Sequence, residues 1–366
     1  MPFTVTTFHR LLDRMADDGA SDLHLSSNEA PYFRIAGQLV RSPDQFSTSA
    51  ELEEVARAVT NAQQYKAFES QKSVDLAMAS ADGERFRVNI YRDRGNVSFA
   101  IRLLDNEFQT LEQLNLPEQL RNFIAMPDGL VLITGPTGSG KTTTLASLIN
   151  QINHDQTKHI ITIEDPIEYV HRNQQSLVHQ RELYTDVPTF GDAVRSSLRE
   201  DPDVILVGEM RDAETIRAAV TAAETGHLVF STLHTGDCVG AIDRMIGVFD
   251  AEEQLALRQQ LSMVLRGVVA QHLIKDPRTG GRVPLSEILF VNPAVANLIR
   301  TSKSAQIYSI MELGSLEGMQ TAEYALADLV ANGVLTESQA MPMARDQRAL
   351  KTRLDRLRGF EVFGNQ

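Results

Sequence analysis

Alternation of apolar and polar residues marks the first hundred residues of the chain. Residues 85–91 read Arg-Phe-Arg-Val-Asn-Ile-Tyr and residues 97–103 read Val-Ser-Phe-Ala-Ile-Arg-Leu, a period of two that is typical of half-buried antiparallel strands. The dipeptide Ala36-Gly37 predicts a hairpin turn between two shorter strands. The other elements expected here are one helix and three short strands, at 8–15, 22–25, 32–35 and 38–41. These patterns predict a small α+β domain over residues 1–105.

The pattern changes after residue 127. Short apolar runs now alternate with stretches of helical periodicity, which favours a parallel sheet with helices on both faces. The strands expected here lie at 129–134, 158–163, 203–207, 227–232 and 284–290. The resulting organisation is a connector over residues 106–127, an α/β domain over 128–297 and a largely helical region over 298–366.

Composition narrows the classes of function. The chain has 366 residues, which predicts two or three domains, and its net charge of −13 disfavours broad binding to nucleic-acid phosphates. No apolar run approaches the roughly 18 residues that a membrane span needs. The first residues also lack the basic and apolar regions of a secretory signal. We therefore expect a cytoplasmic protein without direct membrane insertion.

Two further features each allow two interpretations. Cys238 is the only cysteine, so it is either a buried small side chain or a catalytic thiol. Near the C-terminus, arginines and lysines surround Leu350, Leu354 and Leu357 at helical spacing. Such a helix either docks on the protein or contacts a membrane surface or an acidic partner.

One segment constrains function more tightly than any other. Residues 135–142 read Gly-Pro-Thr-Gly-Ser-Gly-Lys-Thr between an apolar strand and a helix, which is the arrangement of a phosphate-binding loop. Glycines let backbone N–H groups approach phosphates, Lys141 reaches the β- and γ-phosphates, and the Thr142 hydroxyl suits Mg²⁺. The residues expected to bind the nucleotide here are Gly135, Pro136, Thr137, Gly138, Ser139, Gly140, Lys141, Thr142 and Thr143.

Acidic residues follow two of the expected strands. Glu164, Asp165 and Glu168 crowd into one short segment, and on a loop they are either solvated or positioned to activate a water molecule. The strand at 203–207 leads through a glycine to Glu209, at the place where a phosphate-loop protein usually carries an aspartate. We expect Glu209 to act on Mg²⁺ through water.

The combination of these segments closely resembles the secretion-ATPase superfamily, in its pilus-retraction (PilT-type) branch. The resemblance rests on the runs GPTGSGKTTT, TIEDPIEYVH, REDPDVILVGEMRD and AAETGHLVFSTLHT, and it extends over roughly residues 8–335. Residues 19–25 and 85–89 are similar to the family's N-terminal PAS-like domain, and residues 293–300 are similar to its C-terminal retraction motif. The implied fold is α/β: a RecA-like parallel-sheet ATPase domain preceded by a PAS-like α+β domain and followed by a helical region.

The resemblance also implies roles for acids and histidines. Glu168 takes the place of the family's catalytic glutamate, with Glu164 as the next candidate, and Glu209 takes the place of the second acidic site. His227 and His234 fall in the family's histidine box. Either histidine alone is also consistent with a structural role.

Four arginines match positions of the family in the same way. Arg87 and Arg102 match arginines of the N-terminal domain that reach the nucleotide phosphates, and Arg195 and Arg199 match a pair near the subunit boundary. Without the resemblance, each of these arginines is equally consistent with ordinary surface charge.

The function implied by the resemblance is that of a homohexameric motor. It hydrolyses ATP in the presence of Mg²⁺ and drives retraction of a type IV pilus, and with it twitching motility. The implied location is the cytoplasmic side of the inner membrane at the pilus base. The implied partners are an inner-membrane platform protein of the pilus machinery and a paralogous motor ATPase, with no nucleic acid.

Several alternatives stay open. Lys303 and the basic tail beyond about residue 335 depart from the family's pattern, which leaves an accessory PilU-like retraction ATPase or a type II secretion or pilus-assembly ATPase. The phosphate loop and residues 199–212 favour the PilT type. A small-molecule kinase, a nucleic-acid motor and a nucleotide-binding regulator without hydrolysis are more distant alternatives.

Overall fold

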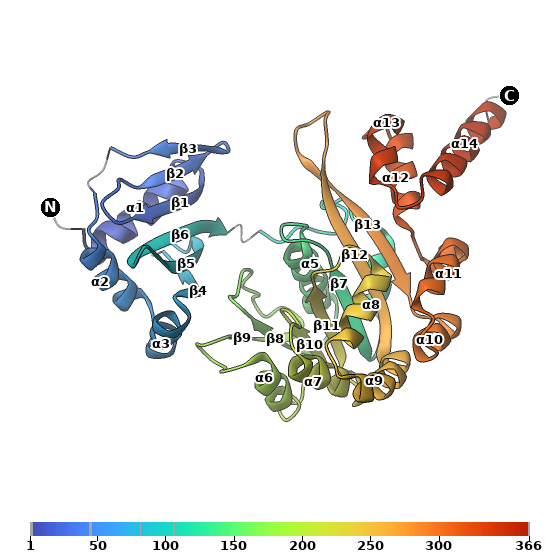
Figure 1. Ribbon diagram of the computed structural model, residues 1–366, viewed down its shortest axis with the longest axis horizontal. Coiled ribbons are helices and arrows are strands. Elements are labelled where there is room, and N and C mark those ends of the chain that lie inside the picture. Colours follow the sequence, from blue (N-terminus) through green and yellow to red (C-terminus); the bar gives the residue numbers. More distant parts are fainter. Residues whose placement is uncertain (1–2, 44–45, 81, 105–106, 365–366) are drawn as a thin grey trace. The chain divides into compact units, whose positions relative to one another are not determined.

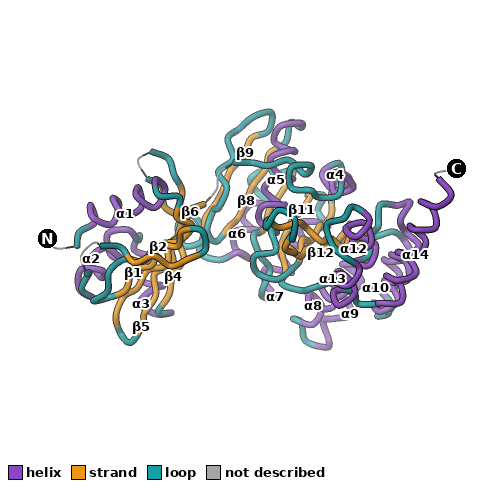
Figure 2. The backbone as a smooth tube through the Cα atoms, turned by 90° about the horizontal axis from the view of Figure 1, so that it is seen from above, coloured by secondary structure: helices purple, strands orange, loops and turns teal. Residues whose placement is uncertain are grey.

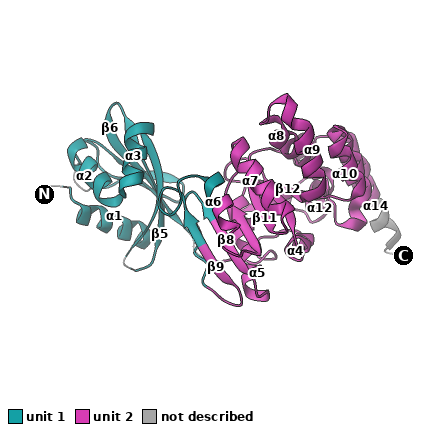
Figure 3. Ribbon diagram, turned by 90° about the horizontal axis from the view of Figure 1, so that it is seen from below, with its two compact units in different colours: residues 1–107, 163–172, 180–193 teal, residues 108–162, 173–179, 194–366 magenta. Residues whose placement is uncertain are grey.

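The computed structural model describes residues 3–43, 46–80, 82–104 and 107–364, with side chains through residue 358. The chain forms two compact units (Figures 1 and 3). The first comprises Met1–Glu107, Ile163–Arg172 and Gln180–Ala193, and the second comprises Phe108–Thr162, Asn173–His179 and Val194–Gln366. The domain limits expected from the sequence stay a prediction, and residues 105–106, at the expected start of the connector, lie outside the described residues.

The first unit contains a six-stranded sheet of order β3-β2-β1-β6-β5-β4, in which each neighbouring pair is antiparallel. Its strands are β1 (Ala20–Ser26), β2 (Tyr32–Ile35), β3 (Gln38–Arg41), β4 (Ser73–Ala79), β5 (Arg85–Asp93) and β6 (Asn96–Leu104). Its helices are α1 (Val5–Asp17), α2 (Ser49–Val59) and α3 (Ala62–Gln71). The expected α+β character of this region is therefore confirmed, although β4, α2 and α3 were not expected.

Local sequence signals account for several of these boundaries. The Thr4 side chain accepts a hydrogen bond from the Thr7 N–H at the start of α1. Thr48 and Glu51 form a reciprocal capping box at the start of α2. The turn between β2 and β3 has positive φ at both Ala36 (49°) and Gly37 (82°), as a tight hairpin that follows the twist of its strands requires.

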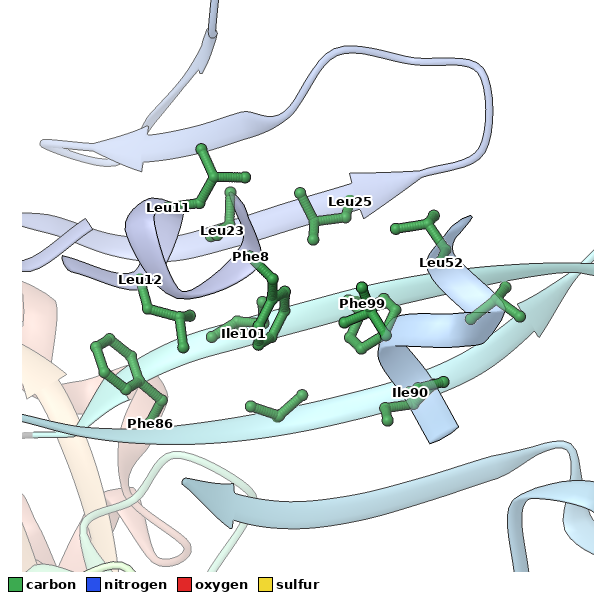
Figure 4. Packing of buried hydrophobic residues seen from close by; sticks show 14 of the residues in the cluster. Phe8, Leu11, Leu12, Leu23, Leu25, Leu52, Phe86, Ile90, Phe99 and Ile101 are labelled. Carbon is green, nitrogen blue, oxygen red and sulfur yellow. The ribbon is translucent and has the colours of Figure 1, made fainter. Parts of the chain in front are cut away.

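The apolar core of the first unit lies on one face of its sheet (Figure 4). Phe8 and Leu12 of α1 pack there with Phe99 and Ile101 of β6, and all four side chains are at most 1% exposed. Because side chains alternate across a strand, the opposite face carries polar residues, including Arg87 of β5. The burial of one set of alternating side chains therefore determines which residues of each strand lie on the opposite, polar face.

The second unit contains a seven-stranded sheet of order β13-β12-β7-β11-β10-β8-β9. Its strands are β7 (Gly129–Thr134), β8 (His159–Glu164), β9 (Leu177–Glu182), β10 (Val204–Val207), β11 (Leu228–Leu233), β12 (Leu265–Lys275) and β13 (Arg282–Phe290). The pairs β12–β7, β7–β11 and β11–β10 are parallel, and β12–β13 is antiparallel. The expected α/β fold is confirmed, as a mixed sheet. β9 and β12 were not expected.

Helices cover both faces of this sheet. The helices before residue 290 are α4 (Arg121–Ile124), α5 (Lys141–Asp155), α6 (Phe190–Ser197), α7 (Ala213–Glu224), α8 (Cys238–Gly247) and α9 (Ala251–Val264). Every residue of β7 is buried, and Val131 and Ile133 pack with Leu145 and Leu148 of α5. α7 and α8 also contact β7, and they lie on the other side of the strands from α5 (Figure 2). Because helices cover both faces, a ligand can bind only where the strands end.

The C-terminal region is helical, as expected. Its α-helices are α10 (Pro293–Arg300), α11 (Ile307–Leu313), α12 (Ala322–Ala331), α13 (Glu337–Ala340) and α14 (Gln347–Gly364). Leu350 and Leu354 of α14 are at most 3% exposed and share a cluster with Leu326 of α12 and Leu285 of β13. The part of α14 whose side chains are described therefore docks on the protein through its leucines. No helix among the described residues has the length and apolar character to span a bilayer.

Cys238 is a buried side chain, which answers the question that the sequence left open. It is 0% exposed, and its thiol lies 3.2 Å from the Val268 carbonyl oxygen. Burial raises the pKa of this thiol well above its ordinary value. A group that is buried and protonated does not serve as a nucleophile.

The segment 163–172 carries the acids Glu164, Asp165 and Glu168. Within the first unit, side chains of other segments hold it by hydrogen bonds to its backbone. Arg85 Nη2 donates to the Ile167 carbonyl oxygen (2.7 Å), and the His171 N–H donates to Gln180 Oε1 (2.7 Å). The His171 side chain is 9% exposed. Burial lowers its pKa to about 4, because the charged imidazolium would lose its hydration.

The stability of the first unit should therefore depend on pH through His171. The unfolded histidine protonates near its ordinary pKa of 6.5, whereas the folded one protonates near 4, so stability is lost as the pH falls through this window. Between about pH 7.5 and about pH 4.5, His171→Gln should remove roughly 2–3 kcal/mol of the acid-induced loss in unfolding free energy. Urea titrations followed by circular dichroism measure this difference.

His154→Gln is a suitable control, because the side chain of His154 is 69% exposed. The control should lose unfolding free energy with falling pH as the wild type does. An equal pH dependence in His171→Gln and in the wild type would contradict the prediction.

Candidate nucleotide-binding site

The segment between β7 and α5 has the backbone of a phosphate-binding loop. Gly135, Gly138 and Gly140 have φ angles of 150°, 77° and 87°, which residues with a Cβ adopt only with strain. A Cβ on Gly135 would lie 2.2 Å from the Gln271 carbonyl oxygen. A Cβ on Gly138 would meet no atom within 4 Å, so the tip of the loop is open to a ligand.

Lys141 begins α5 and points its ammonium group into this loop. Its Nζ donates to the carbonyl oxygens of Gly135 (2.9 Å) and Pro136 (3.2 Å). Burial lowers the pKa of Lys141, and the carboxylate of Glu209 opposes this shift. The loop thus holds a partly desolvated cation whose present partners are neutral carbonyl groups. A phosphate is a stronger partner for such a cation.

Glu209 and His234 meet at the carboxyl ends of neighbouring strands. Glu209 follows β10 and His234 follows β11, and their side-chain atoms Oε2 and Nε2 are 3.5 Å apart. Arg211 Nε lies 2.8 Å from Glu209 Oε1. The next strand in the sheet is β7, which leads into the glycine loop. Parallel strands therefore bring Lys141, Glu209 and His234 to one edge, as an open α/β sheet does for its ligands.

A pair of hydrogen bonds ties the end of β7 to the segment after His234. The Thr235 N–H donates to Thr134 Oγ1 (2.8 Å), and Thr134 Oγ1 donates to the Thr235 carbonyl oxygen (2.8 Å). Thr134 is the residue just before Gly135 and is fully buried. The histidine segment and the phosphate loop are therefore anchored to each other through one buried threonine.

His227 lies at the opposite edge of the sheet. It precedes β11, and its Nδ1 is 2.8 Å from the Ala222 carbonyl oxygen at the end of α7. The six residues of β11 separate it from His234. The structure of the second unit thus brings His234, but not His227, to the edge that carries the glycine loop. A catalytic role for His227 stays a prediction.

Arg195 and Arg199 come from α6 and the turn that follows it. Arg195 Nη2 donates to Glu214 Oε1 of α7 (2.6 Å), and Arg199 is exposed. Both side chains are on the surface of the second unit. A place of Arg195 and Arg199 near a subunit boundary stays a prediction.

The first unit presents two arginines side by side. Arg87 of β5 and Arg102 of β6 are register partners in the antiparallel ladder. Arg102 Nε donates to Asp22 Oδ1 (3.0 Å), and Arg87 Nη1 donates to Glu168 Oε1 (3.0 Å). Like charges at directly opposed positions of a ladder repel, so the two carboxylates offset the repulsion between Arg87 and Arg102.

The acid partners show the effect of this arrangement. The pKa of Asp22 is lowered: burial acts to raise it, but hydrogen bonds from Ser21 and Arg102 and the charge of Arg102 outweigh burial. Asp75 Oδ1 lies 3.5 Å from Arg87 Nε, so Arg87 has two acidic neighbours. Arg87 and Glu168, both expected to be functional, are thus direct partners within one unit. Glu164 accepts a hydrogen bond from Gln180 Nε2 (3.1 Å).

The residues at the loop fit a nucleotide and its magnesium ion. Ser139 is 2% exposed, and its hydroxyl oxygen has no hydrogen-bond partner among the described residues. Thr142 is exposed at the start of α5. Within the same residues no three His, Cys, Asp or Glu side chains gather to hold a metal. An exposed threonine hydroxyl at the start of this helix can ligate Mg²⁺ together with phosphate oxygens and water.

Sequence reasoning missed three residues of this region. Arg211 pairs with Glu209, Asp22 pairs with Arg102, and Gln271 of β12 contacts the glycine loop. Asp22 could have been found from strand register, since alternation places it on the face of Arg102. Gln271 had no such signal because β12 was not expected.

Comparisons with known proteins identify the family. The family model described as type II/IV secretion system protein matches residues 3–341. The type IV pilus retraction ATPase PilT of Pseudomonas aeruginosa is 44% identical over 335 residues, which is 92% of this chain and 97% of that protein. The type IV pilus ATPase PilU of the same organism is 36% identical over 344 residues, or 94% and 90% of the two chains.

A solved structure agrees with these relatives. The crystal structure of the pilus retraction motor PilT with bound ADP matches with a TM-score of 0.84 at 40% identity, over 94% of this chain and 98% of that chain. These comparisons confirm the expected resemblance to the pilus-retraction branch, and with it a nucleotide-binding enzyme of the ATP hydrolase class. This chain therefore belongs to the type II/IV secretion system protein family and has pilus retraction ATPases among its relatives.

Proposed function

We propose that this chain is a motor ATPase that couples ATP hydrolysis to depolymerisation of a type IV pilus. The observation that carries the proposal is identity of 44% to a pilus retraction ATPase across 92% of the chain, including a complete phosphate loop. In this proposal the second unit is a RecA-like ATPase domain and the sheet of the first unit belongs to a PAS-like domain. The motor works as a homohexamer at the cytoplasmic face of the inner membrane, on a platform protein of the pilus machinery.

The phosphate loop is assigned to the triphosphate and its Mg²⁺. Lys141 exchanges the carbonyl oxygens of Gly135 and Pro136 for phosphate oxygens, which is favourable because its ammonium group is already buried beside neutral partners. Thr142 would hold Mg²⁺ by its hydroxyl, and Glu209 would act on the ion through water. When bound, Mg²⁺ neutralises negative charge that develops on the phosphates during transfer. His234 links the carboxylate of Glu209 to the end of β11.

Glu168 is assigned to activation of the attacking water, and Arg87 and Arg102 to the phosphates. Planar guanidinium groups donate two parallel hydrogen bonds to a phosphate. Arg87 forms an ion pair with Glu168 in this structure, with 3.0 Å between Nη1 and Oε1. An arginine that leaves this carboxylate for a phosphate also frees the carboxylate to accept a proton. Nucleotide binding and activation of the base are then one event in this proposal.

The principal alternative is an accessory retraction ATPase of the PilU type. The greater identity to PilT, 44% against 36% to PilU over similar shares of the chain, favours the main motor. A kinase for small molecules and a nucleic-acid motor have no specific feature in their favour, because the acids described above suit water activation and the net charge is −13.

Two substitutions separate nucleotide binding from hydrolysis. Lys141→Ala should abolish ATP binding, because it removes the cation that the loop encloses. Glu168→Gln should bind ATP normally yet hydrolyse it roughly a hundredfold or more slowly, as expected when a proton acceptor is lost. Phosphate release and binding of labelled ATP measure the two effects. Lys158→Ala, just before the start of β8, is the matched control and should behave as wild type. Normal turnover in Glu168→Gln together with slow turnover in Glu164→Gln would move the role to Glu164.

The hexamer is open to a mass measurement. With ATP and Mg²⁺, light scattering coupled to size-exclusion chromatography should give about six times the 40.6 kDa mass of one chain. The nucleotide-binding variant Lys141→Ala should show no gain of mass on adding ATP. A wild-type monomer that hydrolyses ATP at full rate would contradict a ring motor.

The cellular function is tested by complementation. Wild-type chain expressed in a bacterium that lacks its own pilus retraction ATPase should restore twitching motility, and Glu168→Gln at equal abundance should not. Rescue of a strain that lacks only the accessory ATPase, without rescue of the strain that lacks the main motor, would assign the chain to the accessory type.

A further inference from the structure

Gln271 is a buried polar residue that no nucleotide motif includes. It lies in β12, where Ala270 pairs with Thr134, the last residue of β7. Gln271 therefore lies beside Gly135, at the point where β7 gives way to the glycine loop. Its side chain is 2% exposed, so burial would be costly unless both ends of the amide had partners.

Both ends of the amide do have partners, and both partners belong to the phosphate-binding segment. Gln271 Nε2 donates to the Ser139 carbonyl oxygen (2.7 Å), and Thr144 Oγ1 donates to Gln271 Oε1 (2.8 Å). A carbonyl oxygen only accepts, so the bond to Ser139 fixes which end of the amide faces the loop. Ser139 is the last residue before Gly140, and Thr144 is in the first turn of α5.

The bond to Ser139 has a consequence for the next N–H group. The C=O of Ser139 and the N–H of Gly140 belong to one planar trans peptide, in which they point in opposite directions. Holding the C=O toward β12 therefore aims the Gly140 N–H away from β12. Backbone N–H groups of such loops are the donors that receive phosphates. The main chain of Gln271 adds a second constraint, because its carbonyl oxygen occupies the space of a Cβ on Gly135.

We infer that Gln271 is a positioning residue for phosphate binding, which holds the Ser139–Gly140 peptide and the first turn of α5 in the orientation that receives the nucleotide. The inference rests on the proposed function only in taking a nucleotide as the ligand of the loop. A residue that merely filled the core would need neither hydrogen bond, so an apolar side chain of similar length tests the idea.

The decisive experiment compares Gln271→Met with the full-length wild-type chain. Gln271→Met should raise the Kd for fluorescently labelled ADP and the KM for ATP about tenfold, as expected for loss of two buried hydrogen bonds. The kcat should change by less than about threefold, because the phosphate is still bound during turnover. Adenosine, which has no phosphate, should compete with the labelled ADP equally well in both proteins.

Thr144 supplies a second pair of variants, which also serves where Gln271→Met does not fold. Thr144→Val removes one partner of the amide and should weaken ADP binding by a smaller factor, about threefold, whereas Thr144→Ser keeps the hydroxyl and should bind as wild type. The double variant of Gln271→Met and Thr144→Val should bind ADP no worse than Gln271→Met alone, since both act through one amide.

Wild-type affinity for ADP in Gln271→Met, or in Thr144→Val, would overturn the inference. Equal losses for adenosine and ADP would also overturn it, because they would show a structural role without preference for phosphate. A wild-type chain that binds no ADP would overturn the proposed function along with the inference, so the two failures are distinguishable.

Discussion

Parallel pairing of β12, β7, β11 and β10 is the constraint on which the nucleotide site depends. It sends the chain out of three neighbouring strands at the same edge, once into the glycine loop, once toward His234 and once toward Glu209. Hydrogen bonding in these strands is satisfied inside the sheet, so the residues just beyond them are free to serve a ligand. A one-residue slip of β10 would displace Glu209 from Lys141 and would also turn the buried side chains of that strand to the other face.

In the first unit, the candidate functional arginines are held by ion pairs with carboxylates rather than by a glycine loop. Its helices cover one face of the sheet, which leaves the polar side chains of β5 and β6 on the other. Arg87 and Arg102 face each other there and are each held by a carboxylate. Such an arrangement is stable without a ligand and yet can be rearranged by one, because each ion pair is partly exposed and so contributes little to stability.

The sequence predicted the features that are local. β7, β10 and β11 are apolar runs that are buried on both faces, and the phosphate loop has fixed offsets between Gly135 and Thr142. β12 escaped prediction because Gln271 and His272 interrupt its apolar run, and its identity as a strand comes from its partners β7 and β13. The bond from Thr144 to Gln271 joins residues 127 positions apart, a contact that no motif could contain. Burial, which tertiary packing sets, decided the interpretation of Cys238 and showed that the leucines of α14 dock on the protein.

The long antiparallel ladder of β12 and β13 lies next to β7, the strand that leads into the phosphate loop, and can transmit force to it. Nine residue pairs, from Gly267–Phe290 to Lys275–Arg282, join the two strands, and the side chain of Gln320 adds a bond to the Ser286 carbonyl oxygen (2.7 Å). A force parallel to the strands loads the hydrogen bonds of the ladder together. A force perpendicular to the strands would break these hydrogen bonds one after another. Tension applied to the C-terminal helices along β13 would therefore reach the base of the phosphate loop with little yielding in between.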